Sequence, residues 1–533
     1  MRSELAAAVE AALKRPTIDI RPGELNRLAD EAERAVIASG SPIFQRGMSL
    51  VRPTRQNVPA AHGRMTLAAG LASVQQPGAV DLFCSVSNWR RFDKRSADWL
   101  PADPPLMVAA IWLDRRGQWK LPVVAGVITT PTMRPDGSIV SAPGYDPVTR
   151  LYHEADAEMI LTPAVAIATR HDADRALDLL TGLLAGFPFK SDVARAVALS
   201  ALITPVVRGG LSAAPLHGFR ATTAGSGKSF LVDVAAAIAT GRPCPVTAAA
   251  PDDETETEKR LIGLLLAGFP VLSIDNVNGE LGGDLLCQAI ERPLVRLRAL
   301  GRSDIQEIES RATIFATGNN LRVRGDMVRR CILCDLDAGM ERPELREFTT
   351  DPVAIVLADR SLYVSACLVI VRAYILAGRP DVLPPIASFA DWSNTVRSAL
   401  VWLGCADPVA SMEQARDDDP ELEDIRHVMT AWHDANGSVG TTCGRTIALA
   451  AERCGRADEN GDTVPYGHQN GPRFPSLHDA LARIAQGRTG LDPSRLGRWL
   501  QAKEGRIVGG KRFRRDGVTE GSARWVLETV SRT

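Results

Sequence analysis

The chain has 533 residues, enough for about three or four domains. Hydrophobic residues make up 45% and charged residues 23%, the composition of a soluble globular protein with material for several cores. The net charge of −1 excludes no class of partner, because a local basic patch can be hidden in a neutral total. No apolar run approaches the ~18 residues of a membrane span, and Glu4 and Glu10 interrupt the first residues, unlike a signal peptide. We therefore expect a cytoplasmic protein without membrane contact.

The nine cysteines are scattered and repeat no zinc-ligand spacing. The one close pair, Cys331 and Cys334, lies in an apolar run that is typical of a buried strand. We interpret these cysteines as structural, and reduced thiols agree with a cytoplasmic location.

Residues 1–186 are predicted to form an α+β domain. Helical spacing covers 3–13 and 23–39, and short β-like runs cover 44–51, 106–113 and 121–128. A strip from Trp89 to Arg95 interleaves basic and aromatic residues, as single-strand nucleic-acid sites do, but a solvated surface is the favoured interpretation. The domain has no zinc-binding cysteine set or convincing carboxylate pair, so primase activity is not expected.

Residues 187–408 are predicted to form an α/β domain with a parallel sheet, because helix-like and strand-like segments alternate up to about residue 345. A helical extension follows, with one long helix over 353–376 and another over 389–403. An acidic run at 417–424 indicates a boundary, and residues 409–533 are predicted to form a further domain.

The strongest motif is a phosphate loop in a strand–loop–helix setting, between a strand at 217–221 and an apolar helix at 230–239. Gly225 and Gly227 let successive N–H groups point at phosphate oxygens, and the helix start adds its positive dipole end. Lys228 is expected to reach the β- and γ-phosphates and the Ser229 hydroxyl to bind Mg²⁺. The predicted nucleotide-binding residues are Thr222, Thr223, Ala224, Gly225, Ser226, Gly227, Lys228, Ser229 and Phe230. Thr222 stands where the motif has its first glycine.

An apolar strand ending in Asp275 supplies the acidic partner that a phosphate loop needs. Asp275 is predicted to hold the Mg²⁺ ion through water. The next residue, Asn276, can orient a water molecule but cannot take its proton. Either Asp275 therefore does both, or a carboxylate such as Glu258 or Glu280 acts as the base.

Two further elements are predicted to complete the catalytic set. Asn319 and Asn320 follow the apolar strand 312–317, where an amide can hydrogen-bond the γ-phosphate or the attacking water. Arg329 and Arg330 come next and are placed to reach the ATP of a neighbouring subunit, where a guanidinium stabilises the transferring phosphoryl group. Surface ion pairs are the alternative for these arginines.

The order of these four elements resembles the AAA+ ATPases of the helicase superfamily III type, closest to replication helicases of bacteriophages, prophages and integrative elements. Residues 187–408 carry the resemblance, and segments 43–47 and 143–146 share it more loosely. It implies ATP and Mg²⁺ as cofactors, a hexameric ring with ATP between subunits, and DNA in the central channel. The family usually has two acidic residues after the strand that corresponds to the one ending in Asp275 here. Asn276 therefore departs from the family's pattern.

The resemblance also implies a channel hairpin before the sensor strand, and the sequence supports one independently. Apolar and basic residues alternate over 294–300, a turn follows at 301–304, and the chain returns over 305–308. Arg296, Arg298 and Arg302 are predicted to contact DNA phosphates. An ordinary surface hairpin is the alternative.

The last domain is predicted to be a winged helix. Helices are expected over 421–435, from a cap at Thr441 or Thr442 to residue 453, over 475–486 and over 493–503, with wing strands over 506–508, 511–515 and 523–527. From residue 488 onward, eleven lysines and arginines stand against five acidic residues, which indicates nucleic-acid binding. The predicted DNA contacts are Arg495, Arg498, Lys511 and Arg512; a purely protein-binding winged helix is the alternative.

Three functions agree with these features. The first is a ring-forming, ATP-dependent DNA helicase or translocase in phage or mobile-element replication, with other replication proteins as partners. The second is an ATPase that loads or remodels DNA-bound proteins, or serves defence, without unwinding. The third is a DNA-binding scaffold that binds nucleotide without turnover, and Asn276 is the residue that favours it.

Overall fold

The computed structural model describes residues 15–156, 159–249, 254–298, 305–346, 350–452, 456–457, 463–464, 472–488 and 490–530. The predicted helix at 3–13 and the turn that carries Arg302 lie outside these ranges. The chain divides into two compact units, one of residues 1–321 and 329–413, the other of residues 322–328 and 414–533.

A five-stranded sheet forms the centre of the first unit, with the strand order β13-β14-β18-β12-β20. All four pairings are parallel, as the alternating pattern predicts. The strands are β12 (Leu216–Ala221), β13 (Val246–Ala248), β14 (Val271–Asp275), β18 (Thr313–Asn319) and β20 (Cys331–Leu336). Because their carboxyl ends meet at one edge, the residues that follow β12, β14 and β18 lie close together.

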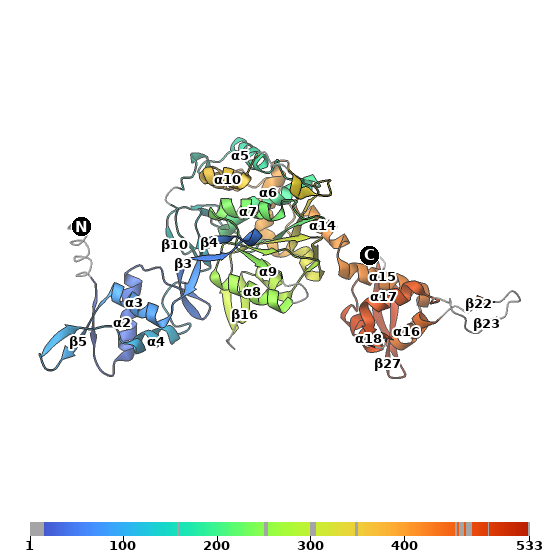
Figure 1. The fold of residues 1–533 in the computed structure, drawn as a ribbon, viewed down its shortest axis with the longest axis horizontal. Coiled ribbons are helices and arrows are strands. Elements are labelled where there is room, and N and C mark those ends of the chain that lie inside the picture. Colours follow the sequence, from blue (N-terminus) through green and yellow to red (C-terminus); the bar gives the residue numbers. More distant parts are fainter. Residues whose placement is uncertain are drawn as a thin grey trace. The chain divides into compact units, whose positions relative to one another are not determined.

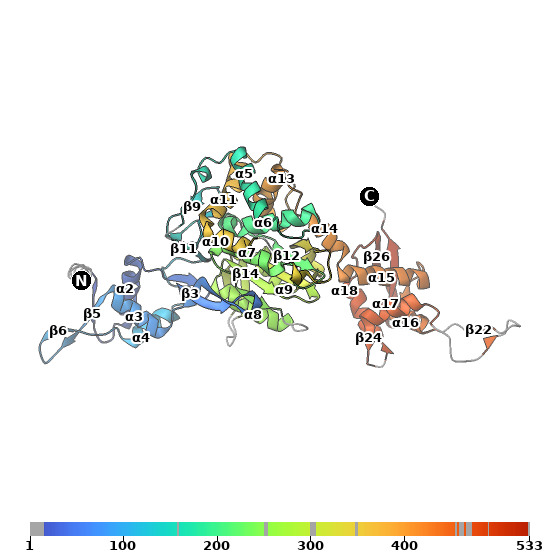
Figure 2. The ribbon, with the colours of Figure 1, turned by 45° about the horizontal axis from the view of Figure 1, so that its top comes forward.

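Helices cover both faces of this sheet (Figures 1 and 2). The apolar helices α6 (Asp192–Val207) and α7 (Lys228–Thr240) lie on one face, and α8 (Glu254–Ala267) and α9 (Asp284–Glu291) on the other. The helical stretch Asp192–Gly210, which contains α6, is long and apolar enough to cross a membrane, but 83% of its most apolar part is buried inside the protein, as expected for a core helix. Cys331 and Cys334 are buried on β20, and burial raises the pKa of the Cys331 thiol to about 12.

The predicted long helix over 353–376 is wrong in one respect, because it is two helices. α10 (Pro352–Ala358) and α11 (Arg360–Leu376) meet at an angle of 95°. Asp359 leaves the helical conformation, and its carboxylate accepts a hydrogen bond from the N–H of Leu362 at the start of α11. The bend brings Arg360 to the end of α7, where its Nε donates to the carbonyl of Ile238 at 3.1 Å. The second predicted helix is observed as α12 (Ala390–Trp392), a π turn (Ser393–Arg397) and α13 (Ser398–Trp402).

The N-terminal residues contribute two larger apolar clusters to the first unit, beside a small third one of Ala125, Ile128 and Leu151. The first packs α2 (Leu25–Ala38), α3 (Gln76–Val86) and α4 (Leu106–Asp114) beside a sheet of β1 (Thr17–Ile20), β5 (Asn88–Asp93) and β6 (Asp98–Pro101). The prediction of a strand at 106–113 is therefore wrong: Pro105 starts a helix there, and an all-apolar run has no periodicity that separates helix from strand. The second cluster lies between β2 (Phe44–Arg46), β3 (Ser49–Pro59), β4 (Met65–Ser73) and the sheet β10-β11-β7 (Gly144–Asp146, Leu151–His153, Gly126–Ile128).

The predicted hairpin after α9 is present. β16 (Leu294–Arg298) pairs antiparallel with β17 (Ile305–Glu309). Arg296 and Arg298 are exposed, whereas the alternate residues Val295 and Leu297 are buried. Glu309 at its base is buried and forms ion pairs of 2.9 Å with Arg150 and Arg311.

The second unit has its own apolar core. Its helices agree with the predicted ones and are α15 (Pro420–Asn436), α16 (Cys443–Ala451), α17 (Pro475–Ala485) and α18 (Pro493–Ala502). Thr442 caps α16, as predicted, by accepting a hydrogen bond from the N–H of Arg445. β26 (Lys511–Thr519) and β27 (Ser522–Thr529) form a hairpin that β21 (Thr441–Thr442) extends. The strand predicted at 506–508 is wrong, since it is reduced to a single bridge between Val508 and Lys511.

Candidate nucleotide-binding site

The predicted phosphate loop joins β12 to α7 at the carboxyl edge of the sheet. Gly225 and Gly227 have φ angles of 75° and 96°, a left-handed conformation that glycine adopts without a steric cost. A Cβ atom at Gly227 would also stand 3.3 Å from the ring of Phe187. Thr222, Ala224 and Gly225 are exposed, so the loop presents its backbone to solvent. Phe230 packs inward, with its ring centroid 6.2 Å from that of Phe187.

Lys228 is the first residue of α7, and its ammonium group lies inside the loop. Nζ donates to the carbonyl of Thr223 at 3.1 Å, to the hydroxyl of Ser226 at 3.0 Å and to Oδ1 of Asn319 at 2.8 Å. Burial lowers the pKa of Lys228, and the nearby Asp275 carboxylate opposes that shift. Lys228 and Asn319, which are 91 residues apart in sequence, are thus in direct contact.

Ser229 and Asp275 also meet, as a shared metal site requires. The Ser229 hydroxyl donates to Oδ1 of Asp275 at 3.1 Å. A hydroxyl and a carboxylate are the oxygen ligands that Mg²⁺ takes when phosphates and water complete its shell. The donor set therefore fits a nucleotide-bound Mg²⁺ ion, for which two protein oxygens are sufficient.

Thr317 holds Asp275 and the turn after it, and the sequence prediction missed it. Its hydroxyl donates to Oδ1 of Asp275 and accepts from the N–H of Asn276 at 3.3 Å. Its carbonyl accepts from the N–H of Val277 at 2.8 Å. The turn passes so close to β18 that a Cβ atom at Gly318 would lie 2.0 Å from the carbonyl oxygen of Val277. A polar residue followed by glycine in an otherwise apolar strand is the signal that could have identified this pair.

Asn276 and Asn320 both stand at the ends of strands with positive φ angles, 57° and 53°. Asparagine tolerates this conformation better than most residues. Both are exposed at the edge that carries the phosphate loop, and the N–H of Asn320 donates to the carbonyl of Ala221. Glu258 on α8 is half-buried and Glu280 on β15 (Glu280–Leu281) is exposed. Asp275, Glu258 and Glu280 are therefore all candidates for the catalytic base.

Arg329 and Arg330 share one carboxylate, that of Glu291 at the end of α9. Arg330 is buried, and its Nε donates to Glu291 at 2.7 Å. Arg329 is exposed, with its guanidinium 3.7 Å from the same carboxylate. Hydrogen bonds from Ser388 and Arg330 lower the pKa of Glu291 although its partial burial opposes them. The side chain of Arg330 is thus buried within the protein, whereas that of Arg329 faces solvent.

The predicted DNA contacts fall on exposed elements of both units. Arg296 has 76% of its side chain exposed, and it pairs with Glu307 across the hairpin at 2.9 Å. Arg302 lies outside the described residues. In the second unit Arg495 and Arg498 are exposed on α18, whereas Lys511 and Arg512 are half-buried on β26 and Arg512 pairs with Glu528.

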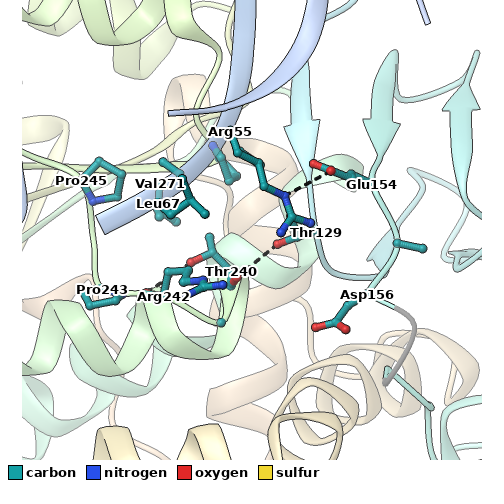
Figure 3. A pocket seen from close by; sticks show the side chains of 15 residues that line it. Arg55, Leu67, Thr129, Glu154, Asp156, Thr240, Arg242, Pro243, Pro245 and Val271 are labelled. Atoms are coloured by element: carbon teal, nitrogen blue, oxygen red, sulfur yellow. Dashed lines mark hydrogen bonds and ion pairs between the residues drawn. The ribbon is translucent and has the colours of Figure 1, made fainter. Parts of the chain in front are cut away.

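A cavity of about 290 Å³ lies at the far end of α7, and it is not the nucleotide site. Thr240 and Gly241 line it, about 20 Å along the helix from the phosphate loop. Figure 3 shows Arg55 reaching across it to Glu154, an ion pair of 3.2 Å. Its charged side chains are of both signs, Arg55 and Arg242 against Glu154 and Asp156.

Comparison with known proteins gives structural matches only. No protein-family model matches the chain, and no curated protein matches it in sequence. An apo structure of the NrS-1 C-terminal region is 11% identical, covers 85% of this chain and 99% of its own, and has a TM-score of 0.31. A second structure of that region, residues 305–718, covers 94% and 98% at 9% identity with a TM-score of 0.33. JCV helicase bound to a small molecule is 13% identical over 48% of this chain and 76% of its own, with a TM-score of 0.20.

Proposed function

We propose that this protein is an ATP-driven, ring-forming DNA helicase or translocase of phage or mobile-element replication. The observation that carries the proposal is the contact of Lys228 with Asn319 and of Ser229 with Asp275. The start of α7 and the ends of β14 and β18, which are far apart in sequence, bring an ammonium, a hydroxyl, a carboxylate and an amide to one glycine-bearing loop. Phosphoryl transfer needs this combination, since its catalysis is mostly positioning and charge stabilisation.

Each residue has a separate task in this proposal. Lys228 and the loop N–H groups bind the phosphates, and Asn319 positions the γ-phosphate or the attacking water. Ser229 and Asp275 would hold Mg²⁺, which neutralises charge on the phosphate oxygens when it is bound. The proton of the attacking water goes to Asp275 or to Glu258 or Glu280, because the Asn276 amide cannot accept it.

The DNA part of the proposal rests on exposed arginines on two elements, the β16–β17 hairpin and α18. Arg296 and Arg298 on the β16–β17 hairpin suit sequence-independent phosphate contact. Arg495 and Arg498 are exposed on α18, a helix of the proposed winged-helix domain at 409–533. The exposed Arg329 is the proposed contact with ATP bound to the neighbouring subunit.

Turnover of ATP by the Lys228→Ala variant tests the ATPase. We expect loss of at least about 100-fold in kcat, since the phosphates lose their main cation. Lys120→Ala is the matched control. It removes an exposed lysine of the N-terminal part of the chain and should keep wild-type turnover. Strand displacement on forked DNA then separates a helicase from an ATPase that only loads or remodels proteins. Wild-type turnover in Lys228→Ala would overturn the proposal.

A scaffold that binds nucleotide without turnover is the second candidate, favoured by Asn276 at the position of the water-activating acid. It predicts that the wild-type protein binds ATP and DNA but releases no phosphate. Measured phosphate release above that of Lys228→Ala excludes it.

A further inference from the structure

The β5–β6 hairpin places the basic-aromatic strip of the N-terminal part in a sheet with two different faces. β5 (Asn88–Asp93) lies between β1 (Thr17–Ile20) and β6 (Asp98–Pro101). Ile18 and Trp89 are paired neighbours on these strands, and both are buried in the cluster of α2, α3 and α4. Side chains alternate along a strand, so Arg90 and Phe92 point to the opposite face.

That opposite face carries an aromatic pair with a cation beside it. Phe92 is directly opposite Trp99, and their ring centroids are 5.6 Å apart in an edge-to-face arrangement. The guanidinium of Arg90 lies over the Trp99 ring, 5.2 Å from its centroid, and Asp19 fixes it with an ion pair of 2.6 Å. Phe92 is 45% exposed. Preformed, exposed aromatic rings of this kind suit the stacking of flat partners.

Positive charge lies at one end of this aromatic face, in the turn that joins β5 and β6. The strip from 88 to 101 contains Arg90, Arg91, Lys94 and Arg95 against two aspartates. Lys94 and Arg95 are exposed in the turn at the tip of the hairpin. Backbone and hydroxyl groups within the turn satisfy Asp93, since Ser96 and the N–H of Arg95 donate to it. The surface therefore combines stacking rings with phosphate-binding cations.

We propose that the β5–β6 hairpin is a binding site for single-stranded nucleic acid. A base stacks on Phe92 beside Trp99, while Lys94 and Arg95 contact the flanking phosphates. Single strands are the matching partner because their bases are free to stack, whereas a duplex offers only its phosphates to this surface. The interaction is separate from the nucleotide site and needs no ATP hydrolysis.

Binding of a fluorescent oligothymidylate to the full chain, measured by polarisation without nucleotide, tests the proposal. Phe92→Ala should weaken binding about 5- to 100-fold at fixed salt and leave the salt dependence unchanged. Phe92→Trp should restore the affinity. Lys94→Ala with Arg95→Ala should instead lower the slope of log affinity against log salt by about 1.4, at ~0.7 for each lost phosphate contact.

Two controls remove comparable exposed side chains elsewhere in the N-terminal part of the chain. Leu106→Ala deletes an apolar residue that is 64% exposed on α4. Arg34→Ala with Lys120→Ala deletes two exposed positive charges. Both should bind like the wild-type protein, and a duplex of the same sequence should show no dependence on Phe92.

Photo-crosslinking localises the contact. A 5-bromouracil oligonucleotide should crosslink to the peptide that carries Phe92 or Trp99. Wild-type affinity and salt slope in the hairpin variants, with crosslinks only on β16–β17 or the second unit, would overturn the proposal. That result would leave the hairpin as a surface for a protein partner. The Lys228→Ala result is independent of it, so this proposal and the ATPase proposal fail separately.

Discussion

At the scale of single residues, Thr317 supports the site although it is not one of the predicted motif residues. Its hydroxyl fixes one oxygen of Asp275, the oxygen that also accepts from Ser229. Partners that orient a metal-binding carboxylate change metal affinity by about 10- to 100-fold when they are removed.

We therefore expect Thr317→Val to raise the Mg²⁺ concentration for half-maximal ATP turnover by about 10-fold. The substitution keeps the side-chain shape but removes the hydrogen bond. Thr317→Ser should restore the wild-type Mg²⁺ dependence, because it returns the hydroxyl. An unchanged Mg²⁺ requirement in Thr317→Val, with turnover lowered or not, would contradict the positioning role.

The sequence predicted the motif residues better than it predicted their supports. Asp275 and Asn319 end β14 and β18, and Lys228 and Ser229 follow the loop after β12 at the start of α7. Parallel strands bring such ends together whatever the details of packing. Glu291 was not predicted, although it holds Arg330 inside the protein, because a helix-end glutamate has no local signal for a partner 39 residues away.

At the scale of elements, Arg46 connects three segments of the first unit. It is buried, and its guanidinium donates to the carbonyls of Val124, Ala125, Leu265, Leu266 and Glu309. These carbonyls belong to the residues just before β7, to the end of α8 and to the base of the β16–β17 hairpin. Burial lowers the pKa of Arg46 to about 10, so the group stays charged at neutral pH.

Arg46→Ala should lower the free energy of unfolding of the first unit by about 3 kcal/mol or more, because it removes the donor that serves five carbonyls at once. Arg46→Lys should recover only part of the loss, since one ammonium cannot reach a ring of five acceptors. Urea unfolding followed by tryptophan fluorescence measures both. Arg52→Ala, exposed on β3, is the control and should stay within about 0.5 kcal/mol of wild type. A similarly small loss in Arg46→Ala would show that these segments pack without it.

Elements with a clear period or a turn signal were predictable, and uniformly apolar ones were not. The alternation at 294–298 identified β16, whereas the run at 106–113 is apolar throughout and is a helix. Length and hydropathy at 353–376 gave no sign of the 95° bend, because the break depends on one residue, Asp359. The strip at 89–95 was interpreted as a solvated surface, because the sequence does not say which face of its strand the helices cover.

At the scale of the whole molecule, the division of the chain was only partly visible in the sequence. Residues 322–328 group with the C-terminal unit, although they lie between β18 and β20. The N–H of Gly325 and the carboxylate of Asp419 meet there at 3.5 Å. Contacts of this kind join positions 94 residues apart and leave no pattern in composition.

The proposed ring predicts a behaviour that only a mixture of two different subunits can show. If Arg329 completes the ATP site of a neighbour, Lys228→Ala and Arg329→Ala each inactivate a different half of every shared site. An Arg329→Ala subunit still has an intact phosphate loop, and a Lys228→Ala subunit still has the arginine.

Mixing equal amounts of these two inactive variants should therefore restore about a quarter of wild-type turnover, since about one interface in four pairs an intact loop with an intact arginine. Arg330→Ala is the comparison, because Arg330 is buried against Glu291 and acts within its own subunit. Its mixture with Lys228→Ala should show no such gain over the activity of the two proteins measured separately. Turnover of the Arg329→Ala mixture that stays at the level of the single variants, with mixed rings verified by native mass spectrometry, would mean that Arg329 does not act on a neighbouring site.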